Sequence, residues 1–456
     1  MDTICALATA PGGALGIIRI SGPQALEILS RVFTKNLTNA ETNTIHYGHI
    51  VSQELPSSGE EGPGVEAKEI LDEVLVSVFR APHSYTGEES AEISCHGSRF
   101  ILNKVLDLLV QSGCRMANPG EYTQRAFLNG KMDLSQAEAV ADLIASSNKA
   151  THQIAMSQLR GHFSSALAQL RQQLLKLTSL LELELDFSDH EDLEFADRSE
   201  LQELTKIIDN HITRLAQSFE TGQALKQGIP VAIVGKTNVG KSTLLNQLVG
   251  DNRAIVSDIH GTTRDTIEET MEINGVQFRF IDTAGIRNTS DEVEQIGISR
   301  TYAAIEKARI VLWLFDEQPG DGELQDMETR CHDKALLRIQ NKIDKNATTF
   351  LASALQISAK KGQGLDTLKD AIFKATNLKA LDEEDVIVSS VRHYDALLRA
   401  HESMVRVEEG LHQQMSGDLL SEDLRQAIDI LGEITGGQIT PQETLNNIFS
   451  HFCVGK

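Results

Sequence analysis

The sequence is poor in cysteine, in long apolar runs and in basic charge. Its five cysteines lie far apart and form no C-x-x-C pair, which argues against a disulfide framework and against a cysteine-ligated zinc site. No stretch reaches about 18 uninterrupted apolar residues, and the first residues lack a basic region followed by a long apolar run. We therefore expect no membrane span, no signal peptide and a cytoplasmic location.

Acidic residues outnumber basic ones, with 65 Asp and Glu against 42 Lys and Arg and a formal net charge of −23. Because clustered Lys and Arg drive phosphate binding, this balance argues against a general nucleic-acid coat, although it leaves room for a local basic patch. With 41% hydrophobic and 23% charged residues, the composition is that of a soluble globular protein. A length of 456 residues predicts about three domains of roughly 150 residues each.

Residues 1–128 mix short apolar runs with glycine and proline. The runs Leu15–Ile20 and Val74–Phe79 predict strands, and the segment Arg99–Val110 predicts a helix. We expect this part of the chain to form a small α/β domain.

A helical domain is predicted from two separated segments, 129–222 and 380–456. Asp133 and Gln136 have the spacing of a helix start. Leucines recur at steps of three and four between Leu159 and Leu185, which predicts one long amphipathic helix over that range. Further helices are expected at 199–221, 391–409 and 419–432. Between the two segments, 226–378 alternates short apolar strands with helical stretches, which indicates a mostly parallel α/β sheet inserted into the helical domain.

A phosphate-binding motif lies at residues 235–242. The sequence GKTNVGKS has the spacing G-x-x-x-x-G-K-S and directly follows the apolar run Ile229–Val234. Its glycines allow backbone N–H groups to close around phosphates, and the N-terminus of the helix that follows adds a positive partial charge. We expect Lys241 to reach the β- and γ-phosphates and the Ser242 hydroxyl to ligate Mg²⁺.

Four further motifs complete the set of a GTP-binding, Ras-like P-loop domain. The sequence GTTRD at 261–265 supplies a threonine for Mg²⁺, and DTAG at 282–285 supplies a carboxylate near Mg²⁺ and a glycine N–H near the γ-phosphate. The sequence NKID at 341–344 ends in an aspartate that can accept from both the N1–H and the exocyclic amine of guanine. The sequence SAK at 358–360 can present a backbone N–H to guanine O6. Five motifs in order predict that this domain binds GTP.

The group that positions the attacking water is not evident from the motifs. Ras-like proteins use a glutamine just after D-x-x-G, and this chain has Ile286 there, which cannot orient water. Glu294 and Arg287 are the candidate catalytic residues, although both also fit solvated loop charges. Asn238 offers a side-chain oxygen to a monovalent cation, or it is an ordinary turn asparagine.

The motifs together resemble the MnmE (TrmE) family of tRNA-modification GTPases, over essentially the full chain. The resemblance is carried by GTTRD at 261–265, DTAGIR at 282–287, LGIIRISG at 15–22, YTGE at 85–88, PGEYTQRAFLNGK at 119–131 and FCVGK at 452–456.

The resemblance implies three domains and a set of partners. The domains are an N-terminal folate-binding and dimerising α/β domain, a discontinuous helical domain and an inserted G domain. The implied partners are a second copy of the chain, the flavin-dependent protein MnmG in a heterotetramer, and tRNA. The implied reaction adds an aminomethyl-type (carboxymethylaminomethyl) group to C5 of the wobble uridine, with one carbon from a tetrahydrofolate derivative in the 5-formyl or 5,10-methylene form. GTP hydrolysis would be stimulated by K⁺.

The resemblance also assigns residues to each ligand. Asn238 would ligate K⁺ together with backbone oxygens of Ser257, Ile259 and Thr262, and Glu294 would position the catalytic water. Ser242 and Thr263 would ligate Mg²⁺. The residues implied to contact folate are Arg19, Glu92, Lys131 and Lys456. The full set of expected GTP-binding residues is Asn238, Val239, Gly240, Lys241, Ser242, Thr243, Ser257, Asp258, Ile259, His260, Gly261, Thr262, Thr263, Asp282, Thr283, Ala284, Gly285, Asn341, Lys342, Asp344, Ser358, Ala359 and Lys360.

Two alternatives belong to other functional classes. A ribosome-assembly GTPase would act as an RNA-binding switch, but such proteins usually append a basic module, and residues 379–456 carry 6 Lys or Arg against 14 Asp or Glu. A free-standing folate-dependent one-carbon transferase would need its own redox cofactor, and no G-x-G-x-x-G fingerprint follows a predicted strand. The missing flavin site favours a partner protein that carries it.

Overall fold

The computed structural model describes residues 2–52, 69–186, 198–250, 269–281, 294–346, 348–377, 385–437, 442–450, 452, 454 and 455. The side chains of residues 184–186, 294–300 and 442–444 are outside the description. The chain divides into two compact units, one of residues 1–141 with 431–456 and one of residues 142–430. No helix within the described ranges is both long and apolar enough to cross a membrane.

The first unit contains a six-stranded sheet in the order β3-β4-β5-β2-β1-β6, in which only the β1–β6 pair is parallel. Its strands are β1 Ile4–Leu7, β2 Leu15–Ser21, β3 Thr44–Ser52, β4 Glu69–Phe79, β5 Ser90–His96 and β6 Arg115–Met116. Helices α1 (Ala25–Val32) and α2 (Arg99–Gln111) cover one face, where alternate strand residues form the core with them. The expected strands and the expected helix are confirmed, and β4 begins five residues earlier than predicted.

The other face of this sheet is covered over β1 by helix α3 (Glu121–Leu128), whose Tyr122 packs with Ile4 and Ala6. Exposed apolar side chains, among them Tyr47 and Leu75, stand on the rest of this face, which we call the open face. Because directly opposed residues point to the same side of a sheet, two rows follow from the register. The rows are Tyr47, Leu75, Ser94 and Ile17, and Ile45, Ser77, Glu92 and Arg19.

Helix α4 (Leu134–Ala145) begins as the sequence predicts. The Asp133 carboxylate accepts from the backbone N–H of Gln136 at 2.9 Å, and the Gln136 side chain accepts from the backbone N–H of Asp133 at 2.9 Å. These reciprocal bonds satisfy two N–H groups that a helix start leaves unpaired. Residues of α4 share a small core with α15 (Gln442–Ser450) in the first unit.

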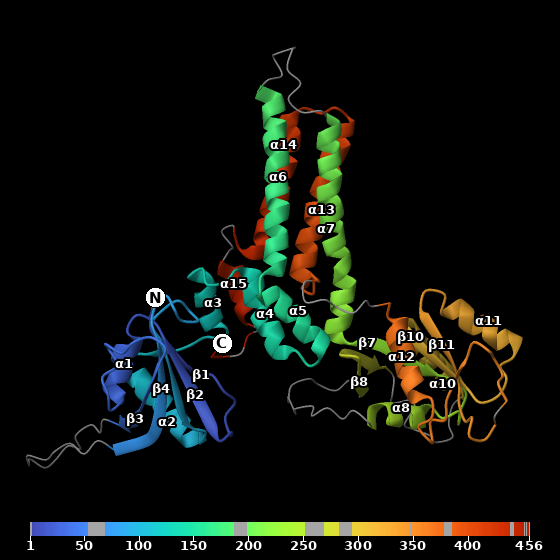
Figure 1. Cartoon of the computed structure of the whole chain (residues 1–456), viewed down its shortest axis with the longest axis horizontal. Helices are drawn as coiled ribbons and strands as arrows, with labels where there is room; N and C mark the ends of the chain where they lie inside the picture. The colour runs from blue at the N-terminus through green and yellow to red at the C-terminus, as the bar shows by residue number, and fades with distance from the viewer. Residues whose placement is uncertain are drawn as a thin grey trace, which may run out of the picture. The chain divides into compact units, whose positions relative to one another are not determined.

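The second unit contains the long antiparallel helices α6 (His162–Asp186), α7 (Arg198–Gln227) and α13 (Val391–His412), together with α14 (Gly417–Thr435) up to residue 430. The leucine repeat predicted as one helix from Leu159 is divided, because α5 (Lys149–Leu159) ends there and Gly161 has a φ of +85° before α6 begins. The repeat itself is buried, with Leu170, Leu174 and Leu177 fully inaccessible. Helices α7 and α13, which flank the inserted sheet in sequence, pack against each other (Figure 1).

The inserted region forms a second sheet, in the order β12-β11-β10-β7-β9-β8, in which only the β8–β9 pair is antiparallel. Its strands are β7 Ile229–Val234, β8 Glu269–Ile273, β9 Val276–Phe280, β10 Ile310–Phe315, β11 Ala335–Gln340 and β12 Leu355–Gln356. Its helices are α8 Lys241–Gly250, α10 Glu294–Lys307, α11 Asp321–Arg330 and α12 Leu365–Ala375. The mostly parallel sheet that the alternating pattern predicted is therefore confirmed.

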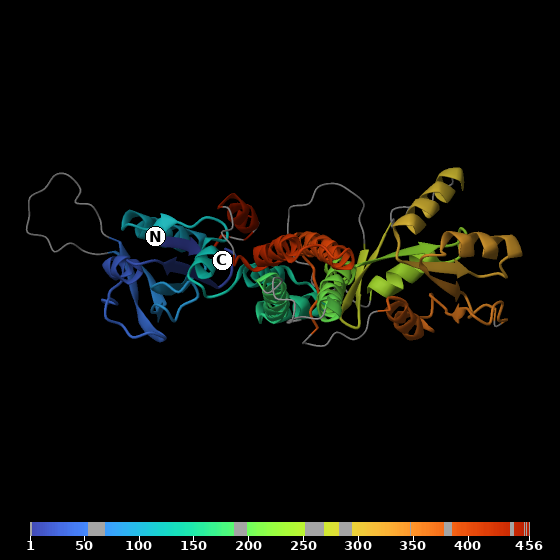
Figure 2. The same cartoon turned by 90° about the horizontal axis from the view of Figure 1, so that it is seen from above.

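Both faces of the second sheet are buried. Along β10, Ile310, Leu312 and Leu314 pack with residues of α8 and α12, whereas Val311 and Trp313 pack with residues of α10 and α11. Figure 2 shows α10 and α11 on the opposite side of the sheet from α12. Helices on both faces explain why the strands read as continuous apolar runs rather than as an alternating pattern.

Candidate functional site

The phosphate-binding motif forms a tight loop between β7 and α8. Gly235 and Gly240 have φ values of +147° and +103°, which favour glycine. A Cβ atom at Gly235 would lie 2.3 Å from the Leu314 carbonyl oxygen, and one at Gly240 would lie 2.4 Å from the Asn341 amide nitrogen. Both glycines of the motif are therefore required by close packing as well as by backbone conformation.

Lys241 closes the loop with its side chain. Its Nζ donates to the carbonyl oxygens of Gly235 at 2.6 Å and Lys236 at 2.8 Å, and burial lowers the pKa of the lysine. Ser242 follows in the first turn of α8, where the N–H groups of a helix start point outward. The arrangement places an ammonium, a hydroxyl and a helix N-terminus together, which suits a polyphosphate with its metal ion.

Asn341 connects three of the predicted motifs. Its amide nitrogen donates to the carbonyl oxygen of Val239 at 2.8 Å, and its amide oxygen accepts from the N–H of Ala359 at 3.0 Å. All three residues are buried. One neutral side chain therefore fixes the phosphate loop, the NKID motif and the SAK motif relative to one another.

Asp344 is held ready to accept hydrogen bonds. The Ser358 hydroxyl donates to its Oδ1 at 2.6 Å, and this bond, supported by Lys361 and Lys345, lowers the pKa of the aspartate. The carboxylate therefore stays charged and oriented at neutral pH. This geometry suits the paired N–H donors of guanine, as the sequence predicts.

Lys342 supports the same region through its ammonium group. Its Nζ donates to the Asn238 carbonyl oxygen at 2.7 Å and pairs with Asp316 at 2.6 Å. Sequence reasoning missed Asp316, although an acidic residue directly after the apolar strand β10 was a usable signal, because such strand ends meet at one edge of a parallel sheet. Thr243 and Lys360 are exposed at the same edge.

Several predicted residues lie outside the described part of the chain. These are Ser257, Asp258, Ile259, His260, Gly261, Thr262, Thr263, Asp282, Thr283, Ala284, Gly285, Arg287 and Lys456. Glu294 is the first residue of α10, and its side chain is outside the description.

Arg19 forms the centre of a second polar cluster, on the open face of the first sheet. Its guanidinium pairs with Glu92 at 2.7 Å and donates to the carbonyl oxygen of Gly455 at 3.2 Å. The guanidinium carbon lies 5.9 Å from the ring centre of Tyr85 and 5.7 Å from that of Tyr122. The pair is about a quarter exposed, with 25% for the Arg19 side chain and 29% for Glu92. We call this cluster the Arg19 site.

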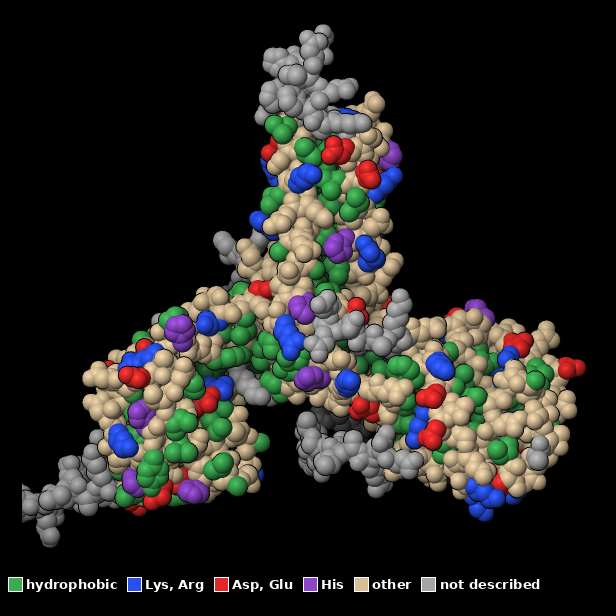
Figure 3. All heavy atoms as spheres, in the orientation of Figure 1, with side chains coloured by type: hydrophobic (Ala, Val, Ile, Leu, Met, Phe, Trp, Pro, Cys, Tyr) green, Lys and Arg blue, Asp and Glu red, His purple; other side chains and the backbone are tan. Residues whose placement is uncertain are grey.

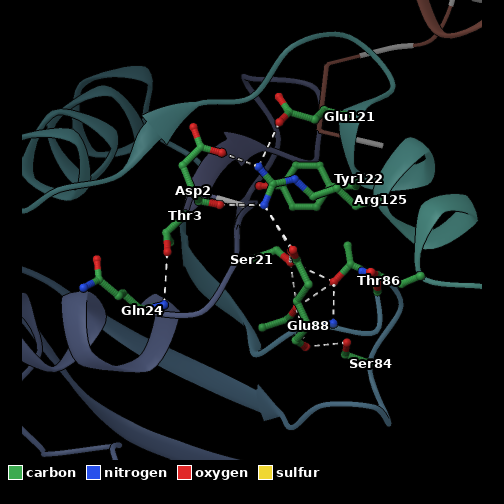
Figure 4. Close-up of polar contacts among 12 residues, drawn as sticks. Asp2, Thr3, Ser21, Gln24, Ser84, Thr86, Glu88, Glu121, Tyr122 and Arg125 are labelled. Carbon is green, nitrogen blue, oxygen red and sulfur yellow. Dashed lines mark hydrogen bonds and ion pairs between the residues drawn. The ribbon is translucent and has the colours of Figure 1, made fainter. Parts of the chain in front are cut away.

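Arg125 of α3 is buried beside the Arg19 site and ties several segments together (Figure 4). Its guanidinium donates to the Asp2 carbonyl oxygen at 2.6 Å and pairs with Glu88 at 3.1 Å and with Glu121 at 2.9 Å. Glu88 also accepts from the Ser21 hydroxyl at 2.9 Å. The chain start, β2, α3 and the loop before β5 are thereby joined through one buried cation.

The structure brings Arg19 and Glu92 into contact and places Lys131 at the loop between β4 and β5. Lys131 Nζ donates to the Pro82 carbonyl oxygen at 2.9 Å. Sequence reasoning missed Tyr85, Tyr122 and Arg125 as members of this cluster. Their signal was their position inside two of the motifs that carried the family resemblance, YTGE and PGEYTQRAFLNGK.

Comparison with known proteins identifies the family. A family model described as the MnmE helical domain matches residues 134–453, and one described as the GTP-binding protein TrmE N-terminus matches residues 3–131. The chain belongs to the MnmE family of tRNA modification GTPases. This membership confirms the resemblance read from the motifs, the predicted fold class and the predicted GTP hydrolase class.

Relatives named tRNA modification GTPase MnmE match the whole chain. The protein of Phocaeicola vulgatus is 52% identical, and the match covers 100% of this chain and 99% of the relative. The MnmE proteins of Bacteroides thetaiotaomicron and Flavobacterium psychrophilum are 51% and 48% identical over the same shares. Among solved structures, the G domain of the T. maritima FeoB iron transporter covers 32% of this chain and 98% of its own length, with 22% identity and a TM-score of 0.25.

Proposed function

We propose that this MnmE family member is a K⁺-stimulated GTPase that acts with a flavin-dependent partner, MnmG, on tRNA. The pair adds an aminomethyl-type (carboxymethylaminomethyl) group to C5 of the wobble uridine, with one carbon from a tetrahydrofolate derivative in the 5-formyl or 5,10-methylene form. The observation that carries GTP binding is the Asn341 bridge, because it holds the phosphate loop beside the guanine-binding motifs. The tRNA role is supported by the relatives' names.

Magnesium and potassium are assigned to the same nucleotide site. Ser242, at the start of α8, is the first proposed Mg²⁺ ligand, and Thr263 is the second. Asn238 is exposed and has a φ of +62°, a conformation that asparagine tolerates, so its side chain can stand at the edge of the loop and ligate K⁺. Backbone oxygens of Ser257, Ile259 and Thr262 complete the proposed K⁺ site, and Glu294 positions the water, with Arg287 as the second candidate.

The potassium assignment is tested at Asn238. We expect Asn238→Gly to retain slow basal hydrolysis but to lose the rate difference between K⁺ and Na⁺ buffers, because glycine keeps the φ of +62° and removes the side-chain oxygen. Steady-state GTP turnover in the two buffers measures this, with Asn346→Gly as a control at an exposed asparagine. Potassium stimulation that survives in Asn238→Gly contradicts the assignment.

The folate derivative is assigned to the Arg19 site. Arg19 and Glu92 offer a cation and a carboxylate side by side, and Lys131 adds a second cation on the adjoining loop. Folates carry glutamate carboxylates that suit Arg and Lys, and a pterin whose amine and N–H groups suit a carboxylate. Lys456 is the fourth proposed contact, and the carbonyl oxygen of its neighbour Gly455 accepts a hydrogen bond from Arg19.

The proposed homodimer uses the open face of the first sheet. Tyr47 and Leu75 are 54% and 48% exposed in one row of that face, and Ile45 is 68% exposed in the row that ends at Glu92 and Arg19. Exposed apolar side chains in one patch are typical of an interface between chains. A dimer through this face would place the Arg19 site next to the second copy.

The partner MnmG is proposed to supply the flavin and much of the grip on tRNA. On the face that Figure 3 shows, described Lys and Arg side chains are scattered rather than gathered into one patch.

We also propose a cytoplasmic location and three domains, at 1–128, at 129–222 with 380–456, and at 226–378.

The first experiment is mass spectrometry of wobble-uridine nucleosides from cells without the gene, complemented by the wild-type chain, Asp344→Asn or Arg19→Ala. We expect the modified nucleoside to return only with the wild-type chain, since one variant loses guanine recognition and the other the folate contact. An unchanged nucleoside profile in cells without the gene contradicts the tRNA role. The ribosome-assembly GTPase would then be the better reading.

A further inference from the structure

Tyr85 is an exposed aromatic side chain at the Arg19 site to which the family motifs assign no role. It lies on the loop between β4 and β5, and it is 41% exposed. An aromatic ring that stays partly exposed to water does not gain the free energy of burying that apolar surface unless a ligand or another chain covers it.

The hydroxyl end of Tyr85 is anchored to α3. It shares a hydrogen bond of 2.9 Å with the hydroxyl of Thr123, which is fully buried. Burial of the tyrosine hydroxyl raises its pKa, so it remains protonated and able to donate at neutral pH. The ring is therefore fixed at its polar end although the residue remains partly exposed.

The loop that carries Tyr85 is anchored as well. The Glu88 side chain pairs with the buried Arg125, and the Ser84 hydroxyl donates to the Glu88 carbonyl oxygen at 2.6 Å (Figure 4). The Asn129 amide donates to the Thr86 carbonyl oxygen at 2.7 Å. Anchors on both sides of residue 85 mean that a ligand meeting the ring has little loop entropy to remove.

The ring stands beside a charged pair. The guanidinium of Arg19 lies 5.9 Å from the ring centre, and the same guanidinium is bonded to Glu92, a carboxylate with a second oxygen for further donors. An aromatic face next to a carboxylate and a guanidinium is suited to a flat, nitrogen-rich heterocycle that also carries acidic groups.

We propose that Tyr85 is a ligand-contacting residue of the Arg19 site, whose ring stacks on the flat pyrimidine half of a pterin while Glu92 accepts from the N–H groups of that heterocycle. This inference rests on the proposed folate function. It adds to that function a residue that contacts the pterin and not the rest of the ligand. The alternative is that Tyr85 only covers Arg19, in which case it would not discriminate between ligands.

Two ligands separate these readings when they are titrated into the full-length chain by calorimetry. The first is 5-formyltetrahydrofolate, and the second is p-aminobenzoylglutamate, which has the carboxylates but lacks the pterin. We expect Tyr85→Leu to weaken binding of the first about tenfold or more, the size typical of stacking on an aromatic side chain, and to leave binding of the second unchanged. Phe100→Leu removes a more exposed aromatic side chain, 65% against 41% for Tyr85, from α2 and is the control.

The anchor is tested with a second pair of variants. Tyr85→Phe and Thr123→Val remove the same hydrogen bond, so each is expected to weaken 5-formyltetrahydrofolate binding about two- to fivefold. The double variant is expected to lose no more than either single one, because the two residues act through one bond. Thermal unfolding of each variant shows whether the first unit stays folded.

The outcomes separate this inference from the proposed function. If the wild-type chain binds neither ligand, the proposed folate function and this inference are both wrong. If the wild-type chain binds 5-formyltetrahydrofolate and Tyr85→Leu binds it equally well, only the role of Tyr85 is wrong. Equal weakening of both ligands in Tyr85→Leu also overturns the stacking contact, because it shows a ligand-independent effect on Arg19.

Discussion

The nucleotide site and the Arg19 site hold their residues together with different groups. In the nucleotide site a neutral amide, Asn341, joins three loops through bonds to backbone atoms of Val239 and Ala359. Beside the Arg19 site a buried cation, Arg125, joins segments through the carboxylates of Asp2, Glu88 and Glu121. Burying a hydrogen-bonded neutral amide costs little free energy. Burying a cation costs much more unless carboxylates stay paired with it. The two sites should therefore fail differently when the bridging residue is removed.

The largest effect is expected for Arg125→Met. Removing the guanidinium leaves the largely buried Glu88 without its cation and leaves Glu121 with Arg115 alone, and breaking a buried ion pair in this way typically costs about 3–5 kcal/mol of stability. Far-UV circular dichroism during urea unfolding should show an earlier transition of the first unit. Fluorescence of Trp313, the single tryptophan and part of the second sheet, should keep its midpoint.

The matched control is Arg31→Met, because Arg31 pairs with Glu27 on the surface of α1 with half of each side chain exposed. Exposed pairs of this kind contribute about 0–1 kcal/mol. Equal destabilisation by the two substitutions would contradict the role given to the buried cation.

A smaller loss, in ligand affinity, is expected for Asn341→Ala. The substitution leaves the Val239 carbonyl and the Ala359 N–H without their partner, at about 1–3 kcal/mol for each buried group. We expect guanine nucleotides to bind about 100-fold more weakly in a titration with a fluorescent GDP analogue. Asn346→Ala, at an exposed asparagine of the same loop, is the control. Wild-type affinity in Asn341→Ala would show that the bridge does not organise the site.

Base selectivity is expected to change in Asp344→Asn. Asparagine replaces one carboxylate oxygen with an NH₂ group, so it no longer accepts hydrogen bonds from both donors of guanine. The NH₂ group can instead donate to the C2 carbonyl of xanthine. Loss of a paired contact of this kind corresponds to about 1–3 kcal/mol of discrimination. Competition between GTP and xanthosine triphosphate should shift toward the latter. Unchanged GTP affinity would exclude Asp344 from guanine recognition.

The smallest effect is expected at Asp2 and depends on pH. The hydrogen bond from Arg115, followed by that from Arg125, lowers the pKa of Asp2 from 3.8 to about 2, against the opposing effect of burial. Because the folded-state pKa lies below the unfolded value, the stabilisation is present above about pH 4 and is lost as the pH falls toward 2.

Thermal unfolding of Asp2→Asn should therefore begin slightly below that of the wild type at pH 7, and the two should converge near pH 2. The Asp2 side chain is 54% exposed, so the difference is expected to stay below about 1 kcal/mol. Asp107→Asn, on the exposed side of α2, is the control. A difference that grows as the pH falls would have the wrong sign for this ion pair.

The amino-acid sequence by itself determined the nucleotide site, because that site is made of short motifs at the ends of strands. Residues 235–242 need glycine at two positions, because φ is positive there and a Cβ atom would clash. The motifs NKID and SAK each place their polar groups within a few residues. The spacing of such loops is fixed by the parallel sheet, whose strand ends meet at one edge. The capping pair Asp133 and Gln136 was readable for the same local reason.

Only the tertiary structure decided how the Arg19 site is built. Arg19 meets Glu92 across a strand pair, Tyr85 across a loop and Gly455 near the far end of the chain, and no local spacing encodes these contacts. The same holds for the division of the leucine repeat at Gly161, where a positive φ ends one helix although the apolar pattern continues. Periodicity records which side chains are buried, whereas packing decides which distant segments they are buried against.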